Sequence, residues 1–180
     1  MTKGALALVL HAHLPYVRST QPGSLEEDWF FQALIECYLP LLDVLEQAVQ
    51  APGVQPRITI GLSPTLLSLL SDGELKQRFP QWLDDRLKLL PRADEALKTA
   101  AQHLESTIKH HRQGWLDCDG DLIGRFARLQ KQGVADLLTC GATHGYLPLL
   151  RQNPEAIRGQ LRTAVREHQR LIGERPLGIW

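Results

Sequence analysis

The chain has 180 residues, of which 43% are hydrophobic and 22% are charged, a composition typical of one folded globular domain. Twenty Lys and Arg residues balance twenty Asp and Glu residues, so the formal net charge is zero and no basic field is present to hold a nucleic acid. The N-terminal apolar run, residues 5–10, is too short for a signal peptide or a membrane span. The cysteines are odd in number and form no Cys-x-x-Cys pair, which fits reduced thiols. We therefore expect one cytoplasmic domain, residues 1–180, with no nucleic-acid or membrane partner and with a small-molecule or neutral polymer substrate.

The first predicted element is a buried strand, Ala5–Leu10, which contains no polar side chain and follows Gly4. His11 and His13 come directly after it, and both should project to the same side because side chains alternate along a strand. Pro15 cannot donate a ladder hydrogen bond, so strand pairing should end near it. Sites in parallel α/β proteins lie just past the carboxyl ends of the strands. The two histidines therefore mark the expected site.

The residues alone leave two interpretations of these histidines open. A histidine beside an apolar run is usually a hydrogen-bonded residue at the rim of a core. Two imidazoles at a strand end can also share a metal ion, as in metal-dependent amidohydrolases, with further ligands from elsewhere in the chain. A polysaccharide deacetylase-like barrel would need an aspartate near this strand end, and neither His11 nor His13 has one beside it.

A helix is predicted after this loop, because a Ser-x-x-Glu pattern typical of a capping box begins at Ser24. Apolar residues then recur at three- and four-residue steps from Phe30 to Ala48, and Pro40 should kink or split this helix. Trp29 lies in the first turn, close to the loop with the histidines. Its ring either packs in the core or stacks on a sugar ring.

The second predicted strand is Arg57–Gly61, a short β-branched run bounded by turn residues. Ser63 and Pro64 are typical of a helix N-cap and first turn, and the chain should be helical from there to about Gln113. The breaks expected in this helical stretch are Gly73, Pro80 and Pro91. Such long helical connections should pack outside a sheet.

Three further histidines fall in this helical stretch among Lys, Arg and Gln residues: His103, His110 and His111. A charged and polar surrounding of this kind is typical of a helix face in contact with solvent. We therefore predict a solvated face here, not a metal cluster.

A third strand, Val134–Cys140, is predicted after a short amphipathic helix, residues 121–132, that ends at Gly133. It runs into the loop Gly141–Pro148, which presents His144 between glycines that permit a close backbone approach to a ligand. This loop repeats the arrangement of the first strand, in which a histidine follows the strand end. The repetition strengthens the hypothesis of a site.

The last predicted helix begins at Asn153 and Pro154, ends at Gly173 and has His168 on its inner face. Pro176–Trp180 should start a fourth strand. Strands and helices alternate with no hairpin signal, which predicts an α/β fold with parallel strands, right-handed helical crossovers and a sheet buried on both faces. An open sheet and part of a barrel fit this order equally well.

Three motifs together resemble glycoside hydrolase family 57, and within it the 1,4-α-glucan branching enzymes: His11–Tyr16, Gly141–Pro148 and Gly178–Trp180. The likeness runs along essentially the whole chain in the same order. Ala-Thr-His-Gly-Tyr-Leu-Pro is the most specific motif and favours the branching subgroup over amylases and amylopullulanases. The resemblance implies the N-terminal portion of an incomplete (β/α)7 barrel, retaining chemistry on α-glucans such as amylose, glycogen and maltooligosaccharides, and no metal or other cofactor.

The resemblance implies that the sugar subsite next to the cleaved bond is lined by His11, His13 and His144. Trp29 is a weaker candidate for a ring that stacks on the sugar. In the family, a glutamate nucleophile follows the tryptophan that matches Trp180, and the acid/base aspartate comes later still. The resemblance therefore implies a barrel truncated before its catalytic carboxylates, with no catalytic residue within this chain. Retaining glycosidases need two carboxyl groups about 5–5.5 Å apart, so we expect the chain alone to be inactive. The alternatives are a non-catalytic α-glucan-binding fragment and a metal-dependent hydrolase that uses His11 and His13.

Overall fold

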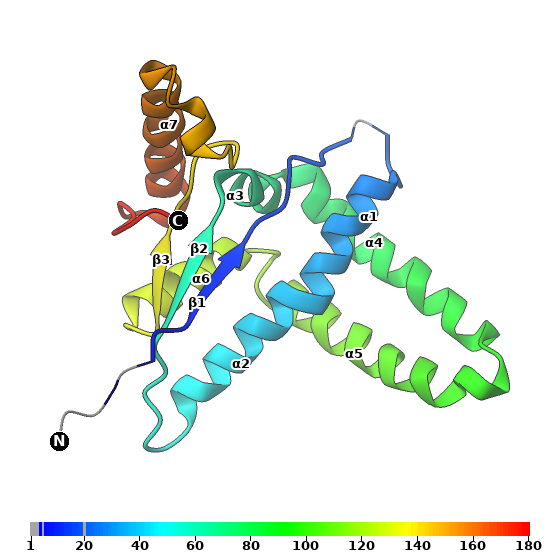
Figure 1. Cartoon of the computed structure of the whole chain (residues 1–180). Coiled ribbons are helices and arrows are strands. Elements are labelled where there is room, and N and C mark those ends of the chain that lie inside the picture. Colours follow the sequence, from blue (N-terminus) through cyan, green and yellow to red (C-terminus); the bar gives the residue numbers. More distant parts are fainter. Residues whose placement is uncertain (1–3, 5, 20) are drawn as a thin grey trace.

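The computed structural model describes residue 4, residues 6–19 and residues 21–180 (Figure 1). Its sheet has three parallel strands in the order β1-β2-β3. The strands are β1 (Val9–Ala12), β2 (Ile58–Leu62) and β3 (Ala135–Leu138). An isolated parallel bridge between Thr139 and Ile179 places the C-terminal segment beside the end of β3. The predicted parallel α/β fold is confirmed, but among the described residues the expected fourth strand is reduced to this single bridge.

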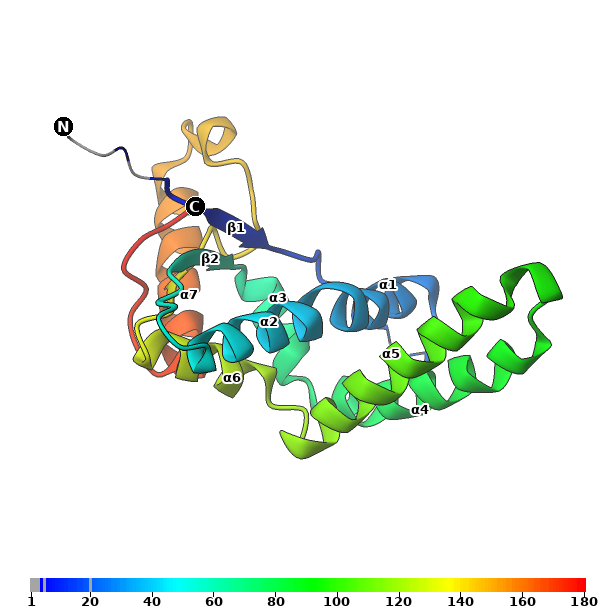
Figure 2. The ribbon, with the colours of Figure 1, turned by 90° about the horizontal axis from the view of Figure 1, so that it is seen from below.

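Helices form every connection between the strands. The first crossover contains α1 (Leu25–Ala33), a π-helical turn (Leu34–Tyr38) and α2 (Leu39–Gln50). The second contains α3 (Pro64–Ser71), α4 (Gly73–Leu89), two 3₁₀ turns (Leu90–Arg92 and Glu95–Leu97), α5 (Lys98–Asp117) and α6 (Leu122–Lys131). A 3₁₀ turn (Leu147–Leu150) and α7 (Pro154–Ile172) follow β3. Figures 1 and 2 show α4 and α5 as a hairpin that extends away from the sheet. In the described ranges, none of the helices has the length and apolar character needed to cross a membrane.

Capping side chains fix the helix starts. The Ser24 hydroxyl accepts a hydrogen bond from the Glu27 N–H at 3.2 Å, and the Asn153 side chain accepts one from the Ala156 N–H at 3.1 Å. Gly173 ends α7 in the left-handed conformation, at a φ of 92°. These helix boundaries agree with those predicted from the sequence.

Two prolines behave differently from each other. Pro40 follows a π-helical turn, in which the Leu39 N–H bonds to the Leu34 carbonyl, so the expected split of this helix is confirmed. Pro80 was expected to break a helix, and this prediction is wrong, because α4 runs through it without interruption. Phe79 and Leu83 on either side of Pro80 are fully buried, and this packing outweighs the lost backbone hydrogen bond.

The first strand begins later than the sequence predicts and is covered on one face. Leu6 and Leu8, which were expected inside the strand, are 94% and 55% exposed, and Ala5 lies outside the described residues. Figures 1 and 2 show helices packed against one side of the three strands. The strand side chains that point into this helical layer are buried: Ala12, Ile60, Leu62, Ala135 and Leu137.

The prediction of a sheet buried on both faces is therefore wrong. The physical reason is the direction of the crossovers, which bring α2, α3 and α6 to the same face, while β1 remains an edge strand. Alternation along β1 then leaves His11 on the uncovered face.

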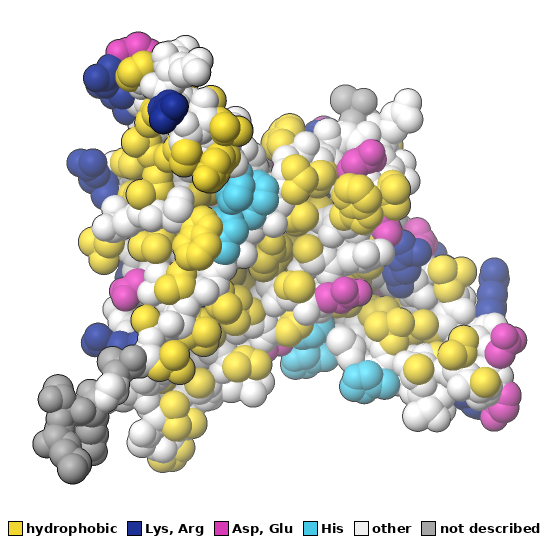
Figure 3. Space-filling view, in the orientation of Figure 1, with side chains coloured by type: hydrophobic (Ala, Val, Ile, Leu, Met, Phe, Trp, Pro, Cys, Tyr) yellow, Lys and Arg dark blue, Asp and Glu magenta, His cyan; other side chains and the backbone are white. Residues whose placement is uncertain are grey.

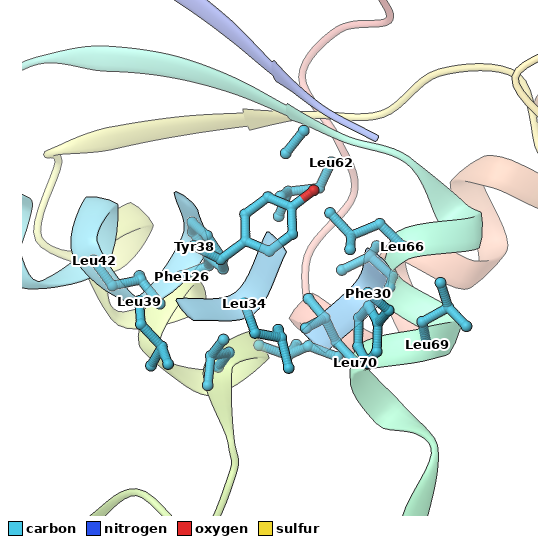
Figure 4. Close-up of a cluster of buried hydrophobic side chains, with 14 of the residues drawn as sticks. Phe30, Leu34, Tyr38, Leu39, Leu42, Leu62, Leu66, Leu69, Leu70 and Phe126 are labelled. Atoms are coloured by element: carbon cyan, nitrogen blue, oxygen red, sulfur yellow. The ribbon is translucent and has the colours of Figure 1, made fainter. Parts of the chain in front are cut away.

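The core lies between the sheet and the helices. Figure 4 shows a cluster of aromatic and aliphatic side chains there, with Tyr38 directed toward Leu62 of β2. Burial of each large apolar side chain contributes about 1.5–3 kcal/mol. An aromatic group continues this core into the hairpin of α4 and α5, where the rings of Phe79 and Trp115 are 4.7 Å apart.

The solvated helix face predicted for the histidines of α5 is confirmed for two of them and wrong for the third. His103 and His110 are exposed, but His111 is buried, with an exposed fraction of 7%. His111 lies on the face of α5 that also carries Ile108 and Trp115, both in the core, because residues three and four positions apart share a helix face. The polar neighbours of His111 in sequence therefore gave a misleading signal.

His168, on the inner face of α7, is fully buried, and neither ring nitrogen has a hydrogen-bond partner among the residues described. Burial lowers the pKa of His168 below its usual 6.5, because the charged form would lose its hydration. As the pH falls below 6.5, the unfolded chain binds a proton at this position that the folded chain does not bind. This difference decreases the free energy of unfolding on the acid side.

We predict that His168→Leu raises the free energy of unfolding by about 1 kcal/mol near neutral pH, because an apolar side chain replaces a buried polar group without a partner. The gain should grow between about pH 7 and about pH 5, since the variant lacks the acid penalty. Urea unfolding followed by circular dichroism measures both effects. His103→Leu, at an exposed position on α5, is the control and should show neither. A His168→Leu variant less stable than the original chain would contradict the prediction.

Candidate functional site: three histidines at the strand ends

His11 is held at the end of β1 by a close contact with the neighbouring strand. The strand register pairs His11 with Gly61. A Cβ atom on Gly61 would lie 3.1 Å from Nδ1 of His11, so glycine leaves the space that the imidazole ring fills. Nδ1 of His11 is buried, and Nε2 is the ring atom directed at another side chain.

His13 is oriented by the residues that begin α3. Its Nδ1 lies 3.0 Å from the Ser63 hydroxyl and 3.4 Å from the Thr65 hydroxyl. Ser63 also caps α3 by accepting from the Leu66 N–H, and Thr65 donates to the Leu14 carbonyl at 2.7 Å. The cap of α3 thus also fixes the ring of His13, with Nε2 as the ring nitrogen that remains for a ligand.

His144 reaches the other two histidines from the loop after β3. Its backbone has a φ of 56°, a left-handed conformation that is uncommon for a residue other than glycine. Gln160 of α7 holds this loop, because its side-chain oxygen accepts from the Thr143 N–H and its NH₂ group donates to the Thr143 hydroxyl, both at 2.9 Å. The strained backbone is thus supported by a side chain from the following helix.

The three rings form one continuous surface, which we call the histidine cluster: His11, His13 and His144. Nε2 of His11 lies 2.7 Å from Nε2 of His144, so one ring donates and the other accepts, and at least one of them is neutral. The rings of His13 and His144 stack with their centroids 4.0 Å apart and their planes at 21°. The predicted common side of His11 and His13 is confirmed by their stacked rings, with centroids 6.0 Å apart.

Burial and mutual proximity favour the neutral forms of His11 and His13. Burial lowers the pKa of His11, and the neighbouring His144 lowers it further. The pKa of His13 is lowered first by burial, then by His144 and His11. A neutral imidazole both donates and accepts hydrogen bonds, which suits the hydroxyl groups of an uncharged ligand.

The stacked arrangement argues against the metal-ligand interpretation of His11 and His13. The lone pair of an imidazole nitrogen lies in the plane of its ring, so nearly parallel rings do not direct their lone pairs at a common point. Nε2 of His11 and Nε2 of His144 are also only 2.7 Å apart, closer than the edge of about 3.3 Å between two ligand atoms of a tetrahedral zinc site.

A pocket of about 400 Å³ opens beside His144. Tyr146 and Trp180 contribute to its wall, and the ring of Trp180 stacks on His11 with the centroids 5.3 Å apart. Figure 3 shows the histidine side chains next to hydrophobic side chains on this face. Within the described part of the chain, the residues that line the pocket include no carboxylate: Cys140, Gly141, His144, Gly145, Tyr146, Leu147, Pro148 and Trp180.

Trp29 is not among the residues that line this pocket. It lies on α1, where its side chain is 48% exposed, and its role as a stacking wall for a sugar stays a prediction. The aromatic ring that the structure places against the histidines is Trp180.

Several residues that build the site were missed at the sequence level: Gly61, Ser63, Thr65 and Gln160. A signal was available for Ser63, because it follows the second strand directly and must lie at the same sheet edge as the histidines. Gln160 gave no such signal, since its role depends on the way α7 folds back against the loop.

The fold and the cluster together define a class of protein. Parallel strands that present hydrogen-bonding rings and an aromatic wall at their carboxyl ends are typical of α/β enzymes with barrel-like sheets. The family model described as glycosyl hydrolase family 57 matches residues 7–180. The chain therefore belongs to glycosyl hydrolase family 57.

Individual relatives agree with this assignment. The chain is 36% identical over 184 residues to a 1,4-α-glucan branching enzyme from Thermococcus kodakarensis. The aligned region covers 99% of this chain and 26% of the relative. A crystal structure of that enzyme in complex with glucose superposes on this chain with a TM-score of 0.89 and 36% sequence identity. The superposition covers 99% of this chain and 33% of the chain in that crystal structure.

Two further solved structures superpose equally well. A family 57 branching enzyme from Pyrococcus horikoshii has a TM-score of 0.91 and 36% identity, covering 99% of this chain and 34% of that one. An α-amylase from Thermotoga maritima has a TM-score of 0.91 and 28% identity, covering 99% of this chain and 35% of that one. The chain thus spans about a quarter to a third of the length of these relatives. It matches the corresponding portion of the incomplete (β/α)7 barrel.

We predict that His11 and His13 titrate below pH 6.5 in a proton NMR titration of the folded chain. In His144→Gln their midpoints should rise, because one neighbouring positive charge is removed, yet stay below 6.5, because burial is the larger cause. His110→Gln, which alters a histidine outside the cluster, is the control and should leave both midpoints unchanged. Unchanged midpoints in His144→Gln would contradict the observed ring contacts.

Proposed function

We propose that this chain is part of a cytoplasmic 1,4-α-glucan branching enzyme that acts in glycogen or starch synthesis. Such an enzyme cleaves an α-1,4 link with retention of configuration and transfers the released chain to a 6-hydroxyl. The proposal rests on the family assignment and on the 36% identity to named branching enzymes. The backbone does not separate branching from hydrolysis, since the α-amylase superposes with the same TM-score as the P. horikoshii branching enzyme.

The contribution of this chain is binding and orientation of the sugar. The observation that supports this role is the convergence of His11, His13 and His144 from two strand ends into one surface of contacting rings. Nε2 of His13 and Nδ1 of His144, which take no part in these contacts, can hydrogen-bond to the hydroxyl groups of a glucose unit next to the cleaved bond, while His11 holds the ring of His144. Trp180 adds an apolar ring against which the face of a sugar can pack.

Retaining chemistry needs a nucleophilic carboxylate and a second carboxyl group about 5–5.5 Å away that protonates the leaving oxygen. Among the residues that the structure describes, no carboxylate lines the pocket beside His144, and we infer that other residues of the enzyme supply these groups. A non-catalytic α-glucan-binding protein is the second candidate, because the same absence of carboxylates from the pocket fits it.

We predict that the chain binds maltoheptaose through the histidine cluster. His144→Ala should weaken this binding about tenfold or more, the effect of losing one or two hydrogen bonds to the sugar. Isothermal titration calorimetry measures the affinity, and His103→Ala, an exposed histidine on α5, is the matched control. Equal affinities for the two variants would contradict the assignment of the sugar subsite. Affinity that disappears after dialysis against EDTA would instead support the metal-dependent alternative.

We also predict that the 180-residue chain, incubated with amylose, forms no α-1,6 links, because its pocket lacks the two carboxylates. Proton NMR resolves the anomeric signals of α-1,4 and α-1,6 links, and the T. kodakarensis branching enzyme is the positive control. New α-1,6 signals from this chain alone would show that carboxylates among its own residues carry out the reaction.

A further inference from the structure

A second group of histidines lies far from the strand ends, where α2, α5 and α6 meet. Figure 3 shows histidine side chains on this face that are separate from those of the histidine cluster. Asp43 of α2 faces both His110 and His111 of α5. Its Oδ2 atom lies 3.0 Å from Nε2 of His110 and 3.3 Å from Nδ1 of His111. One ligand atom from each of the three residues lies within 4.8 Å of the other two.

His111 is the unusual member of this group. It is more than nine-tenths buried, and its Nδ1 atom has no hydrogen-bond partner of acceptable geometry among the described residues. This nitrogen is aimed at the carboxylate of Asp43. A buried polar atom without a partner costs free energy, so a further group that satisfies Nδ1 would stabilise the folded chain.

The two separations from Asp43 suit a small tetrahedral cation. Zinc binds imidazole nitrogen and carboxylate oxygen at about 2.0–2.2 Å, and the edge of such a tetrahedron is about 3.3–3.6 Å long. The observed separations of 3.0 and 3.3 Å from Asp43 to the two histidines are close to this edge. The two imidazole nitrogens lie within 4.8 Å of each other, and rotation of the exposed His110 side chain would bring the three atoms around one ion.

The charges around Asp43 also permit a cation. Arg125 of α6 lies 2.7 Å from the other carboxylate oxygen, Oδ1, and would repel a metal ion. Glu46 bonds to the same guanidinium through both of its oxygens, at 2.9 and 2.7 Å. Two carboxylates therefore face one arginine, and the group keeps a net negative charge while Oδ2 of Asp43 remains directed at the histidines.

We propose that Asp43, His110 and His111 form a zinc site that joins α2 to α5. His110 is exposed, so its side of the site is open to a water molecule as the fourth ligand. The ion would connect the crossover helix next to the sheet with the hairpin of α4 and α5, and its role would be structural. This site is independent of the proposed glucan binding, and it departs from the expectation that the protein holds no metal.

The test is metal binding by the EDTA-dialysed chain, with Zn²⁺ for calorimetry and Co²⁺ as a spectroscopic substitute. One ion should bind per chain, and Zn²⁺ should raise the midpoint of thermal unfolding while Mg²⁺ should not, because the ligand set includes two imidazoles. His110→Ala should weaken the binding at least tenfold. His103→Ala, an exposed histidine on the same helix, should not change it.

His110→Ala is the more informative variant, because His110 is exposed and its replacement leaves the core intact. Asp43→Asn is a second variant that should also lose the metal, provided that circular dichroism shows it to be folded, since it weakens the contact to Arg125 as well. The proposal would be overturned if the chain bound no stoichiometric metal ion or if His110→Ala kept the ion. A thiolate absorption band in the Co²⁺ spectrum, or loss of the ion in His144→Ala, would show that the ion binds elsewhere.

Discussion

The parallel pairing of β1, β2 and β3 is the constraint on which the candidate site depends. Because the three strands run in the same direction, their following loops meet at one edge of the sheet. His11 and His144 are 133 positions apart in the chain, yet their rings are hydrogen-bonded. The pairing of His11 with Gly61 sets the position of the first ring, and a larger residue at position 61 would displace it.

The uneven covering of the sheet explains why the site is accessible. The helices pack on one face of the sheet (Figure 2), where they bury Ala12, Ile60, Leu62, Ala135 and Leu137. His11 lies on the other face, because side chains alternate along β1. Pleating of β1 places Ala12 in the core and His11 on the opposite face within this one short strand. The same alternation gives the chain a stable core and a polar surface without requiring a buried charge at the site.

The two groups of histidines lie in different electrostatic environments. At the strand ends, imidazoles contact one another, and burial together with the neighbouring imidazoles favours the neutral forms of His11 and His13. At the junction of α2, α5 and α6, the histidines face a carboxylate that an arginine and a second carboxylate hold in place. Neutral neighbours suit an uncharged sugar, whereas a net negative group suits a cation.

The sequence by itself determined the order of strands and helices, their parallel arrangement, most helix ends and the three histidines of the cluster. These features follow from local periodicity, from capping residues such as Ser24 and Asn153, and from motifs that resemble a known family. The tertiary structure decided which face of the sheet is covered, that α4 continues through Pro80, that His111 is buried, and that Trp180 is the ring against His11. Each of these depends on contacts between residues distant in sequence, and the free energy of such packing is not encoded in any local pattern.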